Sequence, residues 1–231
     1  MPTARAMDAA KPDTYQVAMY TFAVGFNTVF APSGLPSTNL SSAATAAAGI
    51  SVKTVYDNSC LTSTNCNQDT ETNFSSAMQS LNTIMPAPGA GTSNAGDTPQ
   101  EVVFVVTDGV EDKVVSSPSA CSRPTVSMGS GQYRCQQPID TTWCTSVKNR
   151  GIRIAVLYTE YLPLPTNSWY NSYVAPFNSP GPATGRIATN LQSFPSQGRF
   201  YAVQSGGDLT PPLNALSPPL PPSAAPPHPE E

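Results

Sequence analysis

The segment Glu101–Gly109, EVVFVVTDG, constrains the fold of this chain more than any other. Its run from Val102 to Val106 is apolar on both faces, which is typical of a parallel strand covered by helices on either side. A second run of this kind, IRIAVLY, spans residues 152–158. Because helical patterns alternate with these runs, the sequence predicts an α/β fold with a doubly wound, mostly parallel sheet and helices on both of its faces.

The other periodic segments fit the same class of fold. Apolar residues recur at helical spacing from Phe74 to Met85, and Pro86 ends that pattern. Residues 110–138 are predicted to be a long irregular insertion that carries Cys121 and Cys135. The remaining predictions are a strand over 15–26 with 29–30 pairing back onto it, helices over 40–48, 140–150 and around 187–191, and a last strand over 199–204.

The chain divides into three parts by composition. Residues 1–14 are predicted to be a linker or the remnant of a first helix, and residues 15–210 form the α/β domain with its insertion. Residues 211–231 are rich in proline and end in PPLPPSAAPPHPEE, so they cannot continue a helix. We expect this tail to be disordered or to adopt a polyproline II conformation.

Five cysteines indicate an oxidising compartment. Cys60 and Cys66 flank a polar loop, and Cys121, Cys135 and Cys144 cluster further on, none of them in a CxxC pair. With a single histidine in the chain, these cysteines do not form a zinc site. We expect disulfides and one leftover thiol, and the sequence leaves the pairing open, including the alternative that all five are reduced.

The net charge and the position of the single histidine argue against nucleic-acid binding and against catalysis by a histidine-activated nucleophile. The net charge of −4 gives no basic surface for a nucleic acid backbone. The only histidine, His228, lies in the proline-rich tail, so no Ser-His-Asp or Cys-His pair assembles in the core and we do not expect an enzyme. No signal peptide or membrane span is visible in the sequence. Disulfides form outside the cytoplasm, so the expected disulfides conflict with the lack of a visible export signal. We therefore expect the natural protein to begin upstream of Met1.

Two residues are candidates for a ligand site at the end of the predicted sheet. Asp108 directly follows the apolar run, where ligands of open parallel sheets bind, and Thr72 opens the helix that precedes it. Each also has a plain structural interpretation, Asp108 as a turn residue and Thr72 as a helix cap.

Together the patterns TNFSSAM and VVFVVTDG resemble the von Willebrand factor A domain. The resemblance implies a Rossmann-like sheet and a metal-ion-dependent adhesion site to which Thr72 and Asp108 contribute oxygen ligands for Mg²⁺ or Ca²⁺. The DxSxS motif that supplies the family's main ligands does not occur here. The resemblance thus implies a missing first central strand, between 15–26 and 102–106, and we expect this chain to bind the cation weakly or not at all.

The resemblance narrows to TadG-type proteins of Tad (Flp) pilus assembly through TDGVED, the RGIRIAVLYTEYLPLPTNSWYN stretch and the later LQS segment. It implies a periplasmic, envelope-associated protein, anchored in the inner membrane by an N-terminal helix absent from this sequence, that helps build a surface-adhesion pilus. Its partners would be other pilus-assembly or envelope proteins. The family tends to have a cysteine where this chain has Phe194, and the proline tail replaces an expected last helix.

Two alternatives stay open at this point. The domain is either a module that recognises another protein through the strand-end face of its von Willebrand factor A-like sheet, bridged by a divalent cation, or a purely structural envelope protein without a functional metal site. The aromatic residues after the second apolar run either form a partner-binding surface or pack over the core, and packing is the preferred interpretation; they are Tyr158, Tyr161, Trp169, Tyr170 and Tyr173. Five carboxylates are expected to be solvated loop charges rather than catalytic groups, namely Asp57, Asp69, Glu71, Glu111 and Asp112.

Overall fold

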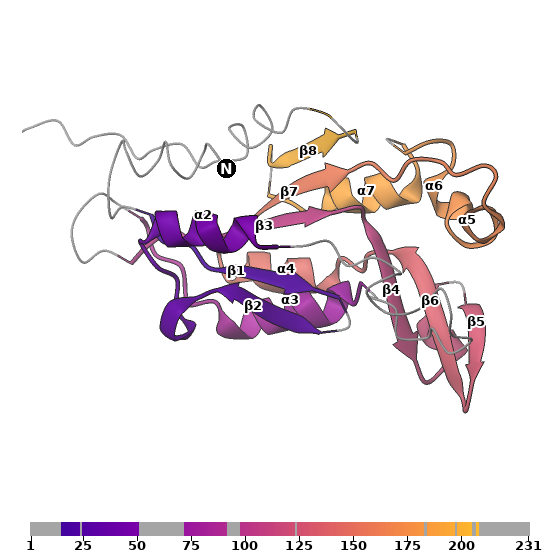
Figure 1. Cartoon of the computed structure of the whole chain (residues 1–231), viewed down its shortest axis with the longest axis horizontal. Coiled ribbons are helices and arrows are strands. Elements are labelled where there is room, and N and C mark those ends of the chain that lie inside the picture. The colour runs from indigo at the N-terminus through magenta and orange to yellow at the C-terminus, as the bar shows by residue number, and fades with distance from the viewer. Residues whose placement is uncertain are drawn as a thin grey trace, which may run out of the picture.

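A three-stranded parallel sheet organises the main body of the protein (Figure 1). Its strands are β3 (Val102–Thr107), β7 (Arg153–Thr159) and β8 (Phe200–Val203), in the order β3-β7-β8. The computed structural model describes residues 15–23, 25–50, 72–91, 98–122, 124–182, 184–196, 198–204 and 207. The predicted mixed α/β class with a parallel sheet is confirmed in this coarse form.

One face of this sheet is buried in the main hydrophobic core. Helices α3 (Phe74–Ile84), α4 (Thr142–Asn149) and α7 (Arg186–Ser193) cover it. The strands contribute Val103, Val105, Ile154, Val156 and Tyr158 to this core. These side chains alternate along their strands, as the period of two residues requires. Short helices α5 (Ser168–Tyr173) and α6 (Ala175–Asn178) close one end of the core.

The opposite face of the sheet departs from the predicted doubly wound arrangement. Phe104 is 43% exposed and Val106 56%, although both lie in the run that the sequence indicates to be buried on both sides. No described helix covers these two side chains. Ala155 and Leu157 of β7 are buried on this face, where Val102 of β3 and Val203 of β8 pack against them. The prediction of helices on both faces was therefore wrong for the described part of the chain.

The N-terminal strands do not join the parallel sheet. Strands β1 (Met19–Phe22) and β2 (Phe26–Phe30) form an antiparallel hairpin, with Phe30 pairing back onto Met19 as predicted. Helix α2 (Leu40–Ala48) packs against β2, capped at Asn39 and ending before Gly49 as predicted. The hairpin reaches the main core through Phe22, whose ring contacts Phe74 edge-on. Among the described strands, only β7 pairs with β3.

The predicted irregular insertion is in fact a second sheet. Strands β4 (Val110–Val115), β5 (Pro124–Gly129) and β6 (Gln132–Pro138) form an antiparallel sheet in the order β4-β6-β5. It projects from the end of β3 as an arm beyond the main body (Figure 1). Cys121 and Cys135 form a disulfide within it. Hydroxyl and amide side chains obscure the strand period in the sequence here, which explains the missed elements.

The junction between β3 and the arm depends on one glycine. Gly109 has a φ of +78°, and a Cβ atom there would lie 2.4 Å from Leu191 Cδ1 of α7. A residue without a side chain is therefore required both by the backbone conformation and by the close approach of α7. The arm is fixed against the body at this point.

The other cysteines divide into two groups. Cys60 and Cys66 lie outside the described residues, so their predicted disulfide state stays a prediction. Cys144 is a free thiol, buried in the main core. Burial raises the pKa of this thiol to about 12, so it is protonated and unreactive at neutral pH. Phe194 fills the same core.

Candidate functional site

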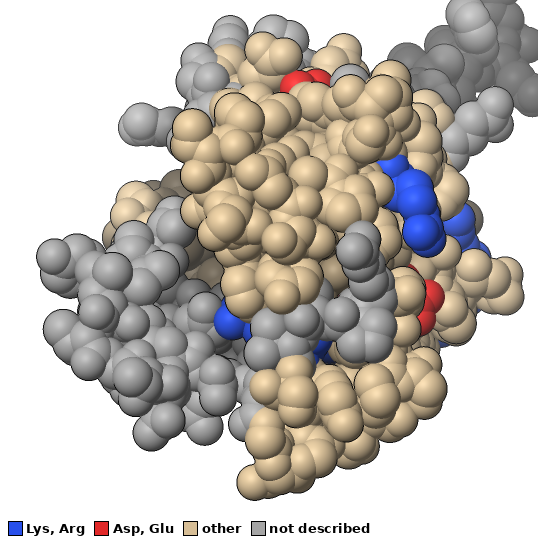
Figure 2. Space-filling model, turned by 90° about the vertical axis from the view of Figure 1, so that its right-hand side faces the viewer, with Lys and Arg blue, Asp and Glu red and all other residues tan. Residues whose placement is uncertain are grey.

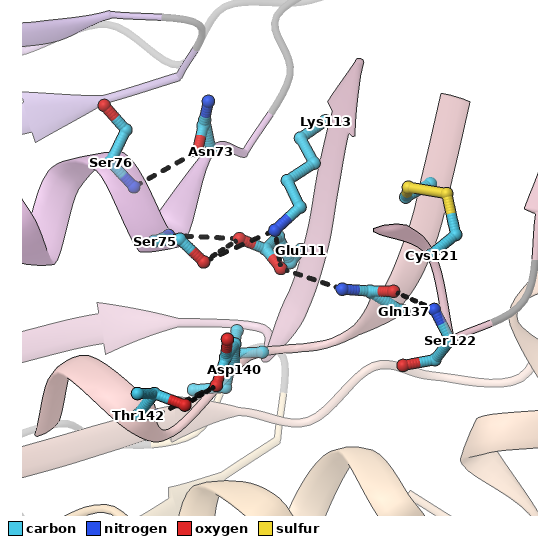
Figure 3. A network of polar contacts seen from close by, with 12 residues as sticks. Asn73, Ser75, Ser76, Glu111, Lys113, Cys121, Ser122, Gln137, Asp140 and Thr142 are labelled. Atoms are coloured by element: carbon cyan, nitrogen blue, oxygen red, sulfur yellow. Dashed lines mark hydrogen bonds and ion pairs between the residues drawn. A yellow bond between two sulfur atoms is a disulfide. The ribbon is translucent and has the colours of Figure 1, made fainter. Parts of the chain in front are cut away.

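A buried carboxylate joins the arm to the body. Glu111 of β4 is 0% exposed, and both of its oxygens are hydrogen-bonded (Figure 3). Oε1 accepts from the backbone N–H of Ser75 at 3.0 Å and from its hydroxyl at 2.7 Å. Oε2 accepts from Gln137 Nε2 at 3.1 Å and lies 3.0 Å from Lys113 Nζ. The charge is thus compensated by one cation and by neutral donors.

The same contacts complete the first turn of α3. Asn73 accepts from the N–H of Ser76, while the Glu111 carboxylate accepts from the N–H of Ser75. A carboxylate at this position satisfies one of the four open N–H groups of a helix start and interacts favourably with the helix dipole. Glu111 therefore acts as a cap supplied from a distant strand. Its interpretation as a solvated loop charge was wrong.

Asp112, the next residue of β4, points to the other face of the arm and forms a second set of contacts. It receives two hydrogen bonds from Arg134, at 2.8 and 2.5 Å, and one from Gln136 Nε2 at 2.9 Å. Gln136 Oε1 in turn accepts from the indole N–H of Trp169 at 2.6 Å. These hydrogen bonds connect Asp112 to α5 through Gln136 and Trp169. The prediction that Asp112 is a solvated loop charge was therefore wrong as well.

Trp169 and Tyr173 lie at the outer end of this series of hydrogen bonds. Their ring centroids are 4.4 Å apart, and the Arg134 guanidinium lies 5.8 Å from the Trp169 centroid. Trp169 is 38% exposed although its ring is held by these contacts. We call Arg134, Gln136, Trp169 and Tyr173 the aromatic platform.

The predicted aromatic cluster therefore divides between packing and surface. Tyr158 and Tyr170 are buried in the main core, and Tyr161 stacks on Tyr170 with centroids 6.0 Å apart. Their packing role, which the sequence favoured, is confirmed. Trp169 is exposed on α5 instead, and the half-buried Tyr173 packs its ring against that of Trp169.

Asp108 lies in the turn between β3 and the arm. Its Oδ1 accepts from the N–H of Val110 at 3.1 Å, and the hydroxyl of Thr107 accepts from the N–H of Gly109. Burial raises the pKa of the Asp108 carboxyl, although the hydrogen bond from Val110 opposes this change. Burial raises the pKa of the Tyr158 and Tyr161 hydroxyls, and the charge of Asp108 adds to this rise.

Thr72 lies beside a different carboxylate. Its backbone pairs with Asp112, whose N–H donates to the Thr72 carbonyl at 3.1 Å. The helix cap is Asn73 rather than Thr72. No hydrogen bond joins Thr72 to Asp108 within the described part of the chain.

These residues do not fit a divalent-cation site by themselves. Mg²⁺ and Ca²⁺ take about six or more oxygen ligands, several of which are usually carboxylates. Residues 15–23, 25–50 and the described segments after 72 hold no group of three or more His, Cys, Asp or Glu side chains able to bind a metal. Asp112 and Glu111, the other carboxylates of this region, are committed to Arg134 and to Lys113. Thr72 and Asp108 stay a predicted ligand pair.

Sequence reasoning missed Glu111, Gln137 and Arg134. The one usable signal was the alternation in VEDKVV, which places Glu111 and Lys113 on one face of a strand and Asp112 on the other. The hydrogen-bond partners of Glu111 and Asp112 lie 22 to 36 residues away along the chain, so a strand register was needed to find them.

Comparisons with known proteins add no relatives. No protein-family model matches this chain, and no curated protein or solved structure matches it. Among the described helices, none is both long and apolar enough to cross a membrane.

Proposed function

We propose that this chain is an assembly module of the bacterial cell envelope that recognises another protein through the aromatic platform. In this proposal it serves Tad (Flp) pilus assembly and surface adhesion in the periplasm, in line with the TadG-type resemblance of its sequence. Its partners are other pilus-assembly or envelope proteins. It performs no catalysis.

The observation that carries the proposal is the composition and rigidity of the platform. Trp, Tyr and Arg are enriched among the few residues that carry most of the binding energy of protein interfaces. Here the Trp169 ring is fixed by Gln136, Arg134 and Tyr173 before any partner arrives. A preorganised surface loses less side-chain entropy on binding, which favours recognition over mere packing.

The surroundings of the platform suit a protein partner. The end of the molecule that carries α5 and the arm is uncharged over most of its visible area, with blue and red atoms in small groups (Figure 2). Leu162 and Leu164, in the loop before α5, are both exposed. Apolar residues with few charges at the centre of a surface are typical of protein interfaces. The disulfide between Cys121 and Cys135 supports a location outside the cytoplasm.

Affinity capture from an envelope extract of the producing cells tests this proposal. A partner retained by the wild-type chain should be lost with Trp169→Ala and kept with Tyr201→Ala, which removes an aromatic ring of similar exposure, 37%, from β8. Repeating the capture in EDTA, which removes divalent cations, tests whether a cation bound by Thr72 and Asp108 contributes to partner binding. A partner retained equally by both variants would contradict the proposal.

The second candidate is a purely structural envelope protein without a functional metal site. The observation that favours it is that Asp108 already serves the turn before the arm, through the N–H of Val110. In that case neither Trp169→Ala nor EDTA changes which proteins are captured, and Asp108→Ala lowers only the stability of the fold.

A further inference from the structure

The arm and the body line an open polar cavity on the face opposite to the aromatic platform. Gln136 and Gln137 are consecutive residues of β6, so their side chains point to opposite faces of the arm. Gln136 contacts Trp169, whereas Gln137 contacts Glu111 and lines the cavity. The cavity has a volume of about 280 Å³ and lies between β4, β6 and α7. It is independent of the proposed recognition surface.

Hydrogen-bond donors and cations predominate in the lining of this cavity. Lys113 and Arg186 supply the cations, and Ser122, Thr141 and Asn190 supply hydroxyl and amide groups. Asp140 is the single carboxylate that lines it. Its Oδ1 already accepts from the N–H and the hydroxyl of Thr142, at 2.9 and 2.7 Å.

The two cations differ in how their charges are compensated. Lys113 lies 3.0 Å from Glu111, and its charge also acts on Asp140. The Arg186 guanidinium lies 5.5 Å from the centroid of the Phe177 ring and forms no ion pair with any described residue. Stacking on an aromatic ring leaves the guanidinium N–H groups free to bind an acceptor in their plane. Arg186 is thus the uncompensated charge of the cavity.

From this arrangement we infer that the cavity binds a single carboxylate group, held by the Arg186 guanidinium. A planar carboxylate matches the two parallel N–H bonds that an arginine offers. One free positive charge balances one negative charge, while Asp140 and the nearby Glu111 oppose a dianion such as phosphate. The volume of about 280 Å³ lies at the lower end of the range of small-molecule pockets, about 300–1,000 Å³. A small carboxylic acid or the carboxyl terminus of a polypeptide fits these limits.

Titration monitored by NMR, with the Nε–H signal of Arg186 as the readout, tests this site in the full chain. The probes are N-acetylglycine, acetyl-triglycine and the C-terminal amide of acetyl-triglycine. The two acids should shift the Arg186 signal, and the amide should not. Tighter binding of acetyl-triglycine than of N-acetylglycine identifies a chain terminus as the source of the carboxylate, and equal binding identifies a small acid.

Two variants complete the test. Arg186→Gln should weaken binding of the acids by about tenfold or more, because it removes both the charge and the paired donors. Lys148→Gln removes the same charge from the last turn of α4, outside the cavity, and should leave the affinity unchanged. The inference is overturned if the amide binds as well as the acid, if inorganic phosphate binds more tightly than either acid, or if Arg186→Gln binds like the wild type.

Discussion

Glu111 is the residue on which the position of the arm depends most. It is fully buried, it completes the first turn of α3, and it pairs with Lys113. Replacing one member of a buried ion pair leaves the other charge without compensation, which is costly even where the intact pair contributes little. Ser75 also loses its acceptor. All of these contacts depend on the Glu111 side chain, so one substitution at this position tests them.

The first prediction concerns Glu111→Ala. We expect the free energy of unfolding to fall by about 3–5 kcal/mol, since Lys113 loses its ion-pair partner and the N–H of Ser75 loses its acceptor. Urea denaturation followed by circular dichroism measures this change. The control is Glu160→Ala, a half-buried carboxylate that forms no ion pair with the described residues, which should cost about 0.5 kcal/mol or less. Equal losses for the two variants would show that Glu111 is not held as described.

A second prediction follows from the raised pKa of Asp108. Burial favours the protonated form in the folded state, so the stability of the fold decreases as the pH rises above the ordinary pKa of 3.8. Asp108→Asn keeps an oxygen for the N–H of Val110 and removes the charge. It should therefore be more stable than the wild type at neutral pH, and the difference should vanish below pH 3.8 in denaturation series across pH.

Asp140 provides a control, because its pKa is shifted in the opposite direction to that of Asp108. Burial acts to raise the pKa of its carboxyl, but the hydrogen bonds from Thr142 and the charge of Lys113 outweigh this and lower the pKa. Its stabilising effect is present at neutral pH and is lost as the pH falls, so Asp140→Asn should be less stable than the wild type at neutral pH. If Asp108→Asn is also less stable there, the Asp108 carboxylate has a partner, such as the predicted cation.

At the scale of elements, apolar runs and helix caps were readable from the sequence. Strands β3 and β7, helix α2 with its cap at Asn39, and the amphipathic helix α3 follow from local pattern alone. The arm did not, because residues such as Ser127 and Gln136 blur the strand period and its partners are distant in sequence. The coverage of the sheet faces was mispredicted, since a run such as 102–106 shows only which side chains are apolar.

The two faces of β3 give a third prediction. Val105 points into the main core, whereas the neighbouring Val106 is largely exposed on the other face. Val105→Ala should lower the free energy of unfolding by about 2 kcal/mol, and Val106→Ala by about 0.5 kcal/mol or less. Both substitutions lower the strand propensity equally, so the difference between their unfolding free energies measures the difference in burial. Equal costs would mean that the second face is covered after all, as the doubly wound prediction required.

At the scale of the whole molecule, the body and the arm together present two unlike surfaces. On one face of the arm, Asp112 and Gln136 support the ring of Trp169. On the other, Lys113 and Gln137 line a polar cavity against α7. Glu111 and Gly109 hold the arm to the body, so both surfaces have fixed geometry. Protein recognition through the aromatic platform is the central claim that this architecture supports.

Photocrosslinking in the producing cells tests that claim most directly. A benzophenone amino acid replaces Ser172, an exposed residue of α5 beside the platform, and Ser41 on the exposed side of α2 serves as the control position. We predict one protein adduct from position 172 that disappears when Trp169→Ala is added, and no such adduct from position 41. An adduct that persists in the presence of Trp169→Ala, or the absence of any adduct at position 172, would contradict recognition through the platform.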